Sequence, residues 1–159
     1  MKIRLAVAAF LTLVTTQAIA EVLYFNGNIQ ATCTFTNASN GRFEQIGPRN
    51  LDALNVGKPA SITVVNSKAG AFKVSITQPS GWVTAPTGVS TTGFQVQPRV
   101  TGPNSGSGFA PNGSKIESVL YNTGSDKIDV GLLFEETSLS ALPNGEYSAS
   151  VIVLCESVP

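Results

Sequence analysis

Residues 22–35, VLYFNGNIQATCTF, decide the fold class of this chain. Apolar or small side chains recur at every second position from Leu23 to Phe35, and mostly polar side chains lie between them. A period of two is typical of a β-strand that buries one face. Cys33 belongs to the apolar set, so we expect its thiol to point into a core.

A second stretch near the other end of the chain has the same pattern. In residues 146–155, EYSASVIVLC, one face carries Tyr147, Ala149, Val151, Val153 and Cys155. Between the two stretches, we expect strands at residues 60–66, 71–77, 94–100, 116–121 and 128–134, separated by segments rich in Gly, Pro, Asn and Ser. Short strands with turns between them predict an all-β fold, an immunoglobulin-like antiparallel β-sandwich.

The segments between these strands predict their connections. Residues 67–70 suggest a hairpin loop, and residues 122–127 a turn-rich connection. Pro98 lacks an amide donor and therefore predicts an edge strand or a strand end for residues 94–100. Residues 102–114 are the most polar stretch, and we expect a surface loop there.

The first twenty residues have the three parts of a secretory signal peptide. Lys2 and Arg4 form a basic region, residues 5–14 are apolar, and Ala18-Ile19-Ala20 matches a cleavage site. An uncleaved membrane tether is the alternative. The sequence therefore predicts export to the periplasm, cell surface or medium, with no transmembrane segment after cleavage of the signal.

Export gives the two cysteines of the chain a simple interpretation. In an oxidising compartment, Cys33 and Cys155 are expected to form one disulfide that joins the first and last strands. Two free buried thiols are the alternative. Residues 21–159 have the size of a single β-sandwich domain.

Composition argues against several functions. Because Lys2 and Arg4 fall in the signal, residues 21–159 carry eight basic and ten acidic side chains, with no basic run for nucleic acid. The chain has no histidine, which excludes Ser-His-Asp, Cys-His and His-metal arrangements. We expect no catalytic residues, no metal site and no cofactor. A hydrolase using Glu135 or Asp129 is a remote alternative. Asp126, Asp129 and Glu135-Glu136 could form a calcium site, but a solvated acidic edge is favoured.

Two aromatic residues are candidates for a ligand surface. Trp82 could stack on a sugar, although a single Trp in a sandwich more often packs against the core. With Phe109 and the loop at residues 102–114, it would serve a closed secreted β-sandwich that recognises a glycan or a protein partner.

The terminal stretches also resemble a known family. Residues 24–35, YFNGNIQATCTF, are similar to the opening strand of bacterial fimbrial subunits, in which an aromatic, a glycine, an aliphatic and a cysteine follow in order. Residues 143–153, PNGEYSASVIV, are similar to their closing strand, in which Gly-x-Tyr precedes small and β-branched residues.

The resemblance implies an exported structural or adhesive subunit of a fimbrium or pilus. Its sandwich would be incomplete, would fold with a periplasmic chaperone and would be completed by a strand from a neighbouring subunit. The groove between the terminal strands would be lined by Leu23, Phe25, Ile29, Tyr147, Val151 and Val153.

Overall fold

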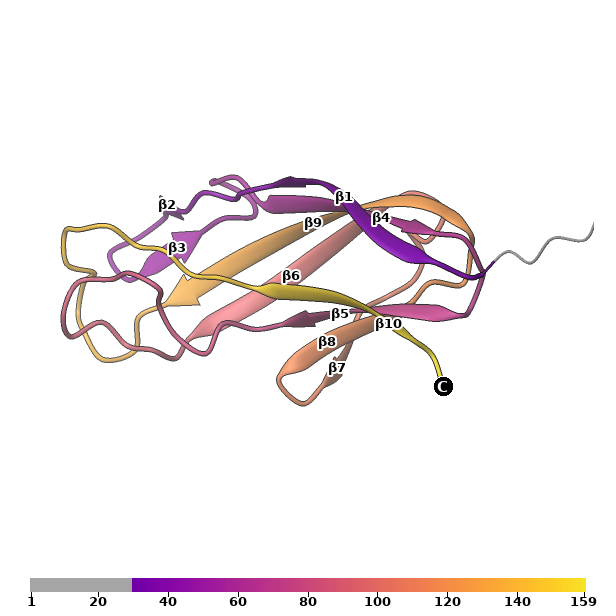
Figure 1. Ribbon diagram of the computed structural model, residues 1–159. Coiled ribbons are helices and arrows are strands. Elements are labelled where there is room, and N and C mark those ends of the chain that lie inside the picture. Colours follow the sequence, from indigo (N-terminus) through magenta and orange to yellow (C-terminus); the bar gives the residue numbers. More distant parts are fainter. Residues whose placement is uncertain (1–29) are drawn as a thin grey trace, which may run out of the picture.

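Two antiparallel β-sheets pack face to face in the computed structural model, which describes residues 30–159 (Figure 1). The strands are β1 (Cys33–Ser39), β2 (Glu44–Gln45), β3 (Asn50–Asp52), β4 (Ala60–Asn66), β5 (Phe72–Thr77), β6 (Phe94–Thr101), β7 (Ala110–Asn112), β8 (Lys115–Val119), β9 (Gly124–Glu135) and β10 (Ile152–Ser157). Over this range, no helix is long and apolar enough to cross a bilayer. The predicted all-β sandwich is confirmed.

The first sheet is built around β9. Along one edge β9 pairs first with β4 and then with β3, and along the other edge it pairs with β6. β1 adds to β4, and β2 adds to β3. β6 is therefore an edge strand, as Pro98 predicts, and β1 forms an edge on the opposite side.

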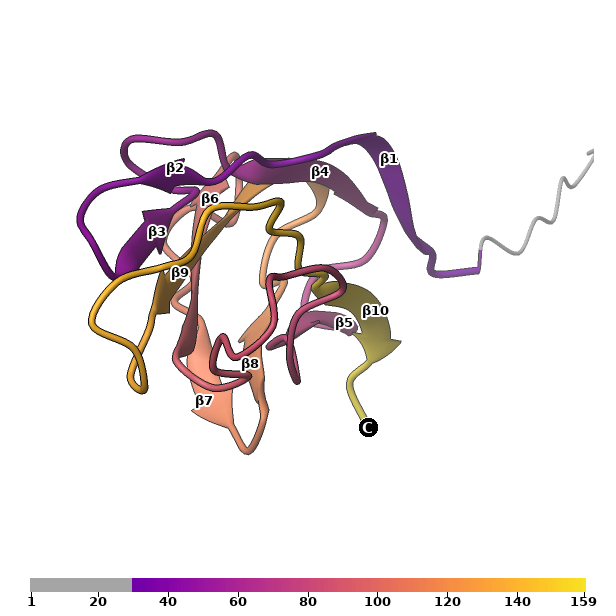
Figure 2. The same ribbon diagram turned by 90° about the vertical axis from the view of Figure 1, so that its left-hand side faces the viewer.

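The second sheet has the order β10-β5-β8-β7. Its edge strands are β10 and the short β7, which forms a hairpin with β8. Figure 2 shows that β10 lies on the same side of the sandwich as β1, so each sheet has a free edge on that side.

The core lies between the two sheets and follows the alternation of their strands. β9 contributes four buried apolar side chains, Ile128, Val130, Leu132 and Phe134. They belong to one cluster with Val74 and Ile76 of β5. Burial of each such side chain stabilises the fold by about 1.5–3 kcal/mol, so this interface holds the sheets together.

The two cysteines form the predicted disulfide. Cys33 begins β1 in the first sheet, and Cys155 lies in β10 of the second, with their Cα atoms 6.3 Å apart. The bond therefore joins the first and last strands and links the two sheets at their open side.

The terminal strands differ from their predicted bounds. Residues 22–29 of the first predicted strand lie outside the described residues, and the ladder begins only at Cys33. Thr32 precedes the ladder because β4 ends at Asn66, and Thr32 bonds instead to the side chain of Ser67. At the other end, β10 begins only at Ile152, because its partner β5 ends at Thr77.

Two predicted connections are wrong. Residues 67–70 do not close a hairpin, because β4 and β5 belong to different sheets. Residues 124–127 are not a turn, since they extend β9 along β4 down to the pair Asn66–Gly124. Alternation reports a buried face, but it does not report which strand will be the neighbour.

The predicted surface loop at residues 102–114 is only partly a loop. Residues 110–112 form β7. Asn104 is buried, because its side chain forms hydrogen bonds with the carboxylate of Asp126 and with the backbone of Asn122.

Candidate functional site

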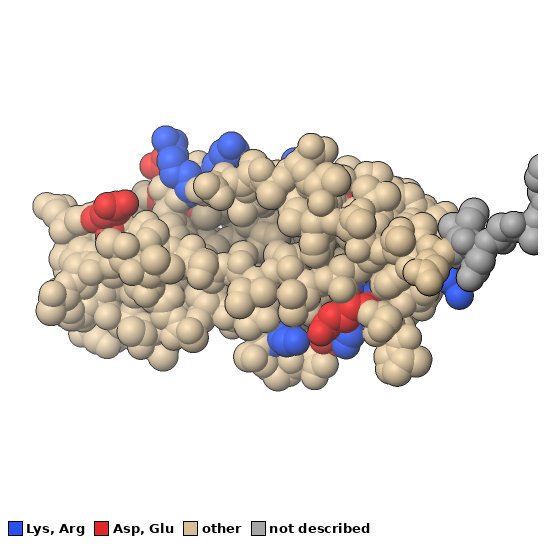
Figure 3. Space-filling view, in the orientation of Figure 1, with Lys and Arg blue, Asp and Glu red and all other residues tan. Residues whose placement is uncertain are grey.

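An apolar cleft of about 380 Å³ opens between the two sheet edges. One wall is residues 41–43, which continue from β1, and the other is residues 145–151, which lead into β10. The floor is made of core or near-core side chains, namely Leu51, Ala53, Ala60, Val130 and Leu132. Figure 3 shows this face of the molecule, where charged side chains lie at the margins and uncharged residues fill the middle.

The wall on the β1 side presents unused backbone groups. Arg42 and Lys58 exchange two backbone hydrogen bonds, of 2.7 and 2.9 Å. In an antiparallel pair, the neighbours of a doubly bonded residue direct their N–H and C=O groups the opposite way. The backbone groups of Gly41 and Phe43 therefore point away from Lys58, toward the open edge.

The opposite wall has the same arrangement. Ser148 exchanges backbone hydrogen bonds of 2.8 and 3.2 Å with Thr84. Tyr147 and Ala149 consequently turn their backbone groups away from Thr84, toward the open edge. The cleft thus lies between two strand-like edges that can still accept a partner strand.

Tyr147 is anchored in its wall by its hydroxyl group. The hydroxyl donates a hydrogen bond of 2.6 Å to the carbonyl oxygen of Pro143. Burial and, to a smaller extent, the negative charge of Glu136 raise the pKa of Tyr147 above its usual value, so the donor stays protonated. A hydroxyl bonded four residues upstream is the arrangement of a tyrosine corner in immunoglobulin-like sandwiches.

Trp82 packs inside the sandwich beside the cleft. Its ring lies edge-on to Phe94 and Phe134, at centroid distances of 4.6 and 4.5 Å, and contacts Phe43 and Tyr147 from the two cleft walls. The indole N–H donates to the carbonyl oxygen of Ser90. Trp82 therefore packs against the core, which is the second of the two interpretations of this residue, and does not present an open face for a sugar.

The other predicted ligand-surface residue is also partly covered. Phe109 packs against the core cluster and is half-buried. Among residues 30–159, no aromatic contact joins the rings of Phe109 and Trp82.

The prediction of a solvated acidic edge is wrong for two of its carboxylates, which are not exposed to solvent. Glu136 and Asp126 are fully buried, whereas Glu135 is exposed. Burial tends to raise the pKa of Glu136, but donors led by the amides of Ser138 and Ser90 outweigh it, and the pKa is lowered overall. Asp129 forms an ion pair of 2.7 Å with Lys127. Within residues 30–159, no group of acidic residues is arranged to hold a metal ion.

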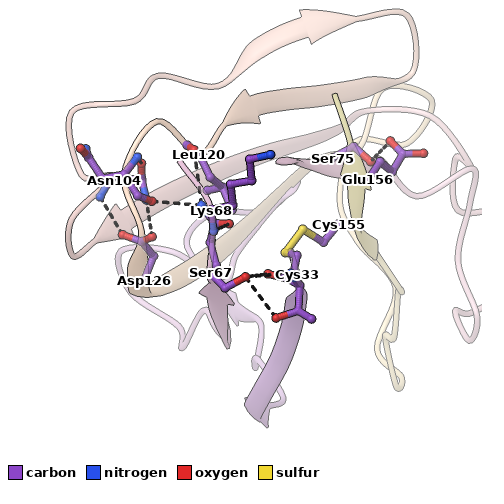
Figure 4. Close-up of a disulfide and its surroundings, with 12 residues drawn as sticks. Cys33, Ser67, Lys68, Ser75, Asn104, Leu120, Asp126, Cys155 and Glu156 are labelled. Carbon is purple, nitrogen blue, oxygen red and sulfur yellow. Dashed lines mark hydrogen bonds between the residues drawn. A yellow bond between two sulfur atoms is a disulfide. The ribbon is translucent and has the colours of Figure 1, made fainter. Parts of the chain in front are cut away.

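Polar groups surround the disulfide at the far end of the open side (Figure 4). Ser67 bonds to the backbone of Thr32 next to Cys33, and Asn104 bonds to Asp126 through both its amide groups. These bonds hold the chain around the disulfide.

The predicted groove residues fall into three groups. Leu23, Phe25 and Ile29 lie outside the described residues. Tyr147 and Val151 line the cleft, and Val153 packs against the core on the same strand face as Cys155, two residues before it.

Sequence reasoning missed the opposite wall of the cleft. Gly41 and Phe43 follow β1 in a stretch where the sequence shows no regular alternation. The alternation of residues 146–155 predicts the face of Ala149, and its small side chain leaves room in the cleft.

No protein-family model matches the chain, and no curated protein sequence matches it.

Proposed function

We propose that this chain is an exported, non-enzymatic structural or adhesive surface protein that is completed by a β-strand from a partner, in the manner of a fimbrial subunit. The observation that carries the proposal is the apolar cleft between the two unpaired edges. A strand inserted there would gain backbone hydrogen bonds from the edges and would place alternate side chains on the apolar floor.

The edges of the sheets differ in a way that supports this role. On the far side of the sandwich, β6 carries Pro98 and the short β7 carries Pro111. Proline blocks strand addition because it lacks an amide donor. Neither β1 nor β10 carries a proline. The edge strands on one side of the sandwich therefore carry prolines that hinder strand addition, and the edge strands on the side where the cleft opens carry none.

The disulfide supports the proposed location. Disulfides form and persist in the periplasm, at cell surfaces and outside cells. The partners that we propose, from the resemblance to fimbrial subunits, are other pilus-like subunits and a periplasmic chaperone that would cover the open edges before assembly.

A peptide-binding experiment tests the proposal. A synthetic strand with valine or isoleucine at alternate positions is titrated into the purified chain, and the melting temperature and Kd are measured. Binding at a peptide concentration about 100 times the Kd raises stability by about 2.7 kcal/mol. A peptide of the same composition in scrambled order serves as the control.

Two variants localise the binding to the cleft. Ala149→Trp fills the cleft from its wall and should abolish binding. Ser150→Trp places the same side chain at the next position, which is exposed and faces the other way, and should leave binding unchanged. A chain that shows no complex and no thermal shift with any alternating peptide would refute the proposal.

A further inference from the structure

We infer that Trp82 is a positioning residue for the proposed strand binding, because its ring holds the two walls of the cleft at the separation that an inserted strand needs. The inference rests on the proposed function, since it concerns the same cleft. Trp82 does not itself line the cleft, so it acts through the wall residues that it contacts.

The ring of Trp82 connects the two walls. Phe43 lies in the wall that follows β1, Tyr147 lies in the wall that leads into β10, and both line the cleft. The centroid of the Trp82 ring is 5.9 Å from that of Phe43 and 5.3 Å from that of Tyr147. Among residues 30–159, no aromatic contact joins Phe43 to Tyr147 directly. The Trp82 ring therefore bridges the two wall rings.

The position of the ring above β9 shows what it does between the sheets. Val130 and Leu132 are buried residues of β9 that line the cleft, and Phe134 is the next residue on the same face of this strand. Phe134 does not line the cleft, and the Trp82 ring lies only 4.5 Å from its ring. The chain thus fills the space above Phe134 with its own side chain, while the cleft is open above Leu132.

The ring is fixed on two sides. Its indole N–H donates a hydrogen bond of 2.8 Å to the carbonyl oxygen of Ser90. The backbone amide of the next residue, Val83, donates one of 2.8 Å to the carbonyl oxygen of Ser148, which lies in the wall beside β10. Trp82 is therefore attached to one wall through the backbone and reaches Phe43 of the other wall with its ring.

Loss of this ring should narrow the cleft. Truncation of a large packed side chain leaves a cavity, and the surrounding groups relax partly into it. Here those groups include Phe43 and Tyr147, so the two walls would approach each other. A chain whose open form is only partly populated binds its partner more weakly in proportion to that population.

Binding kinetics of two variants test the inference on the full chain. With the alternating peptide, Trp82→Leu should raise the Kd about tenfold or more, mainly through a slower kon, because a narrowed cleft must open before the peptide enters. Trp82→Phe keeps an aromatic ring against both walls and should lose less affinity.

A core truncation away from the cleft is the matched control. Leu120 is buried with 3% of its surface exposed and does not line the cleft. Leu120→Ala also destabilises the fold through a cavity, but it should change the Kd by less than about twofold. All variants are compared at a temperature at which each is folded.

Fluorescence of the wild-type chain gives a second measurement that requires no variant. Trp82 is the only tryptophan of the chain, so the tryptophan emission reports on this ring alone. Trp82 is half-buried, and a strand inserted beside Phe43 and Tyr147 should exclude water from its surroundings. The emission maximum should therefore shift to shorter wavelength with the Kd found by calorimetry, and the scrambled peptide should cause no shift.

The outcomes separate the two claims. A folded Trp82→Leu variant with the wild-type Kd, or with a loss confined to koff, overturns the role of the ring and leaves the proposed function standing. Peptide binding that leaves the wild-type emission unchanged has the same consequence. Failure of the wild type to bind any alternating peptide overturns both.

Discussion

Glu136 accepts a hydrogen bond of 2.8 Å from the backbone amide of Ser90, which lies 46 positions earlier in the chain. The carbonyl oxygen of the same Ser90 accepts the indole N–H of Trp82. The buried carboxylate of Glu136, directly after β9, thereby fixes Ser90, and Ser90 in turn fixes the ring of Trp82. The second oxygen of Glu136 accepts from the amides of Ser138 and Leu139, so both oxygens are used.

Replacement of Glu136 by glutamine should destabilise the fold. The side-chain NH₂ of glutamine would face the backbone N–H of either Ser90 or Ser138. Both groups are donors, so that backbone N–H would lose its hydrogen-bond acceptor. We expect a loss of about 2–3 kcal/mol in the free energy of unfolding, measured by urea denaturation. Glu135→Gln is the matched control, because Glu135 is exposed; it should change stability by less than about 0.5 kcal/mol. Equal losses in both variants would contradict the role of Glu136.

The depressed pKa of Glu136 also predicts a dependence of stability on pH. The folded-state pKa lies below the usual value of 4.5, so the ionised carboxylate stabilises the fold. This contribution is fully present above the unfolded pKa and is lost as the pH falls through the lower, folded pKa. Unfolding curves at a series of pH values should show the loss below about pH 4.5, and Glu136→Gln should flatten it. An unaltered acid profile in the variant would rule out this assignment.

The parts of the fold that the sequence predicts are those that depend on one strand at a time. The strand at residues 60–66 was predicted with its observed bounds, because alternation is a local property. The disulfide was predicted because Cys33 and Cys155 are the two cysteines of a chain with an export signal. Neither inference requires knowledge of a neighbour.

The parts that were not predicted depend on contacts between distant residues. Burial of Glu136 requires the amide of Ser90, and nothing in the local sequence marks that partner. The turn after Asn66 crosses between sheets because its side chain bonds to the carbonyl oxygens of Leu120 and Asn122. The cleft wall at Gly41 likewise needs the pairing of Arg42 with Lys58.

Tyr147→Phe tests the anchor of the cleft wall. The variant removes the hydrogen bond to the carbonyl oxygen of Pro143 but keeps the ring against Trp82. Stability should fall by about 1–1.5 kcal/mol, the usual value for one lost hydrogen bond. Tyr121→Phe is the control because Tyr121 is 65% exposed, and it should be neutral within about 0.5 kcal/mol. Thermal and urea unfolding of the two variants provide the measurement, and a neutral Tyr147→Phe would show that the hydroxyl group does not anchor the wall.

Gly131 tests the packing on the outer face of β9. A Cβ atom at this position would lie 2.5 Å from the side chain of Leu54, which covers the strand. Gly131→Ala should therefore cost about 1–3 kcal/mol through overpacking. Gly106→Ala is the control, since no atom lies within 4 Å of its Cβ position. Adding Leu54→Gly, which also removes the Leu54 Cβ atom 2.6 Å away, should recover part of the loss caused by Gly131→Ala, so strictly additive effects in this double-mutant cycle would contradict the contact.

The disulfide should contribute a large share of the net stability. Its cysteines are 122 positions apart, and a loop of that length restricts the unfolded chain by an amount equivalent to about 4–5 kcal/mol. Reduction of the wild-type protein should therefore lower its free energy of unfolding by about this amount in urea titrations. The Cys33→Ala/Cys155→Ala variant should be equally destabilised and insensitive to reductant. A wild-type protein that loses less than about 1 kcal/mol on reduction would show that packing between β1 and β10, rather than the covalent link, holds the two ends together.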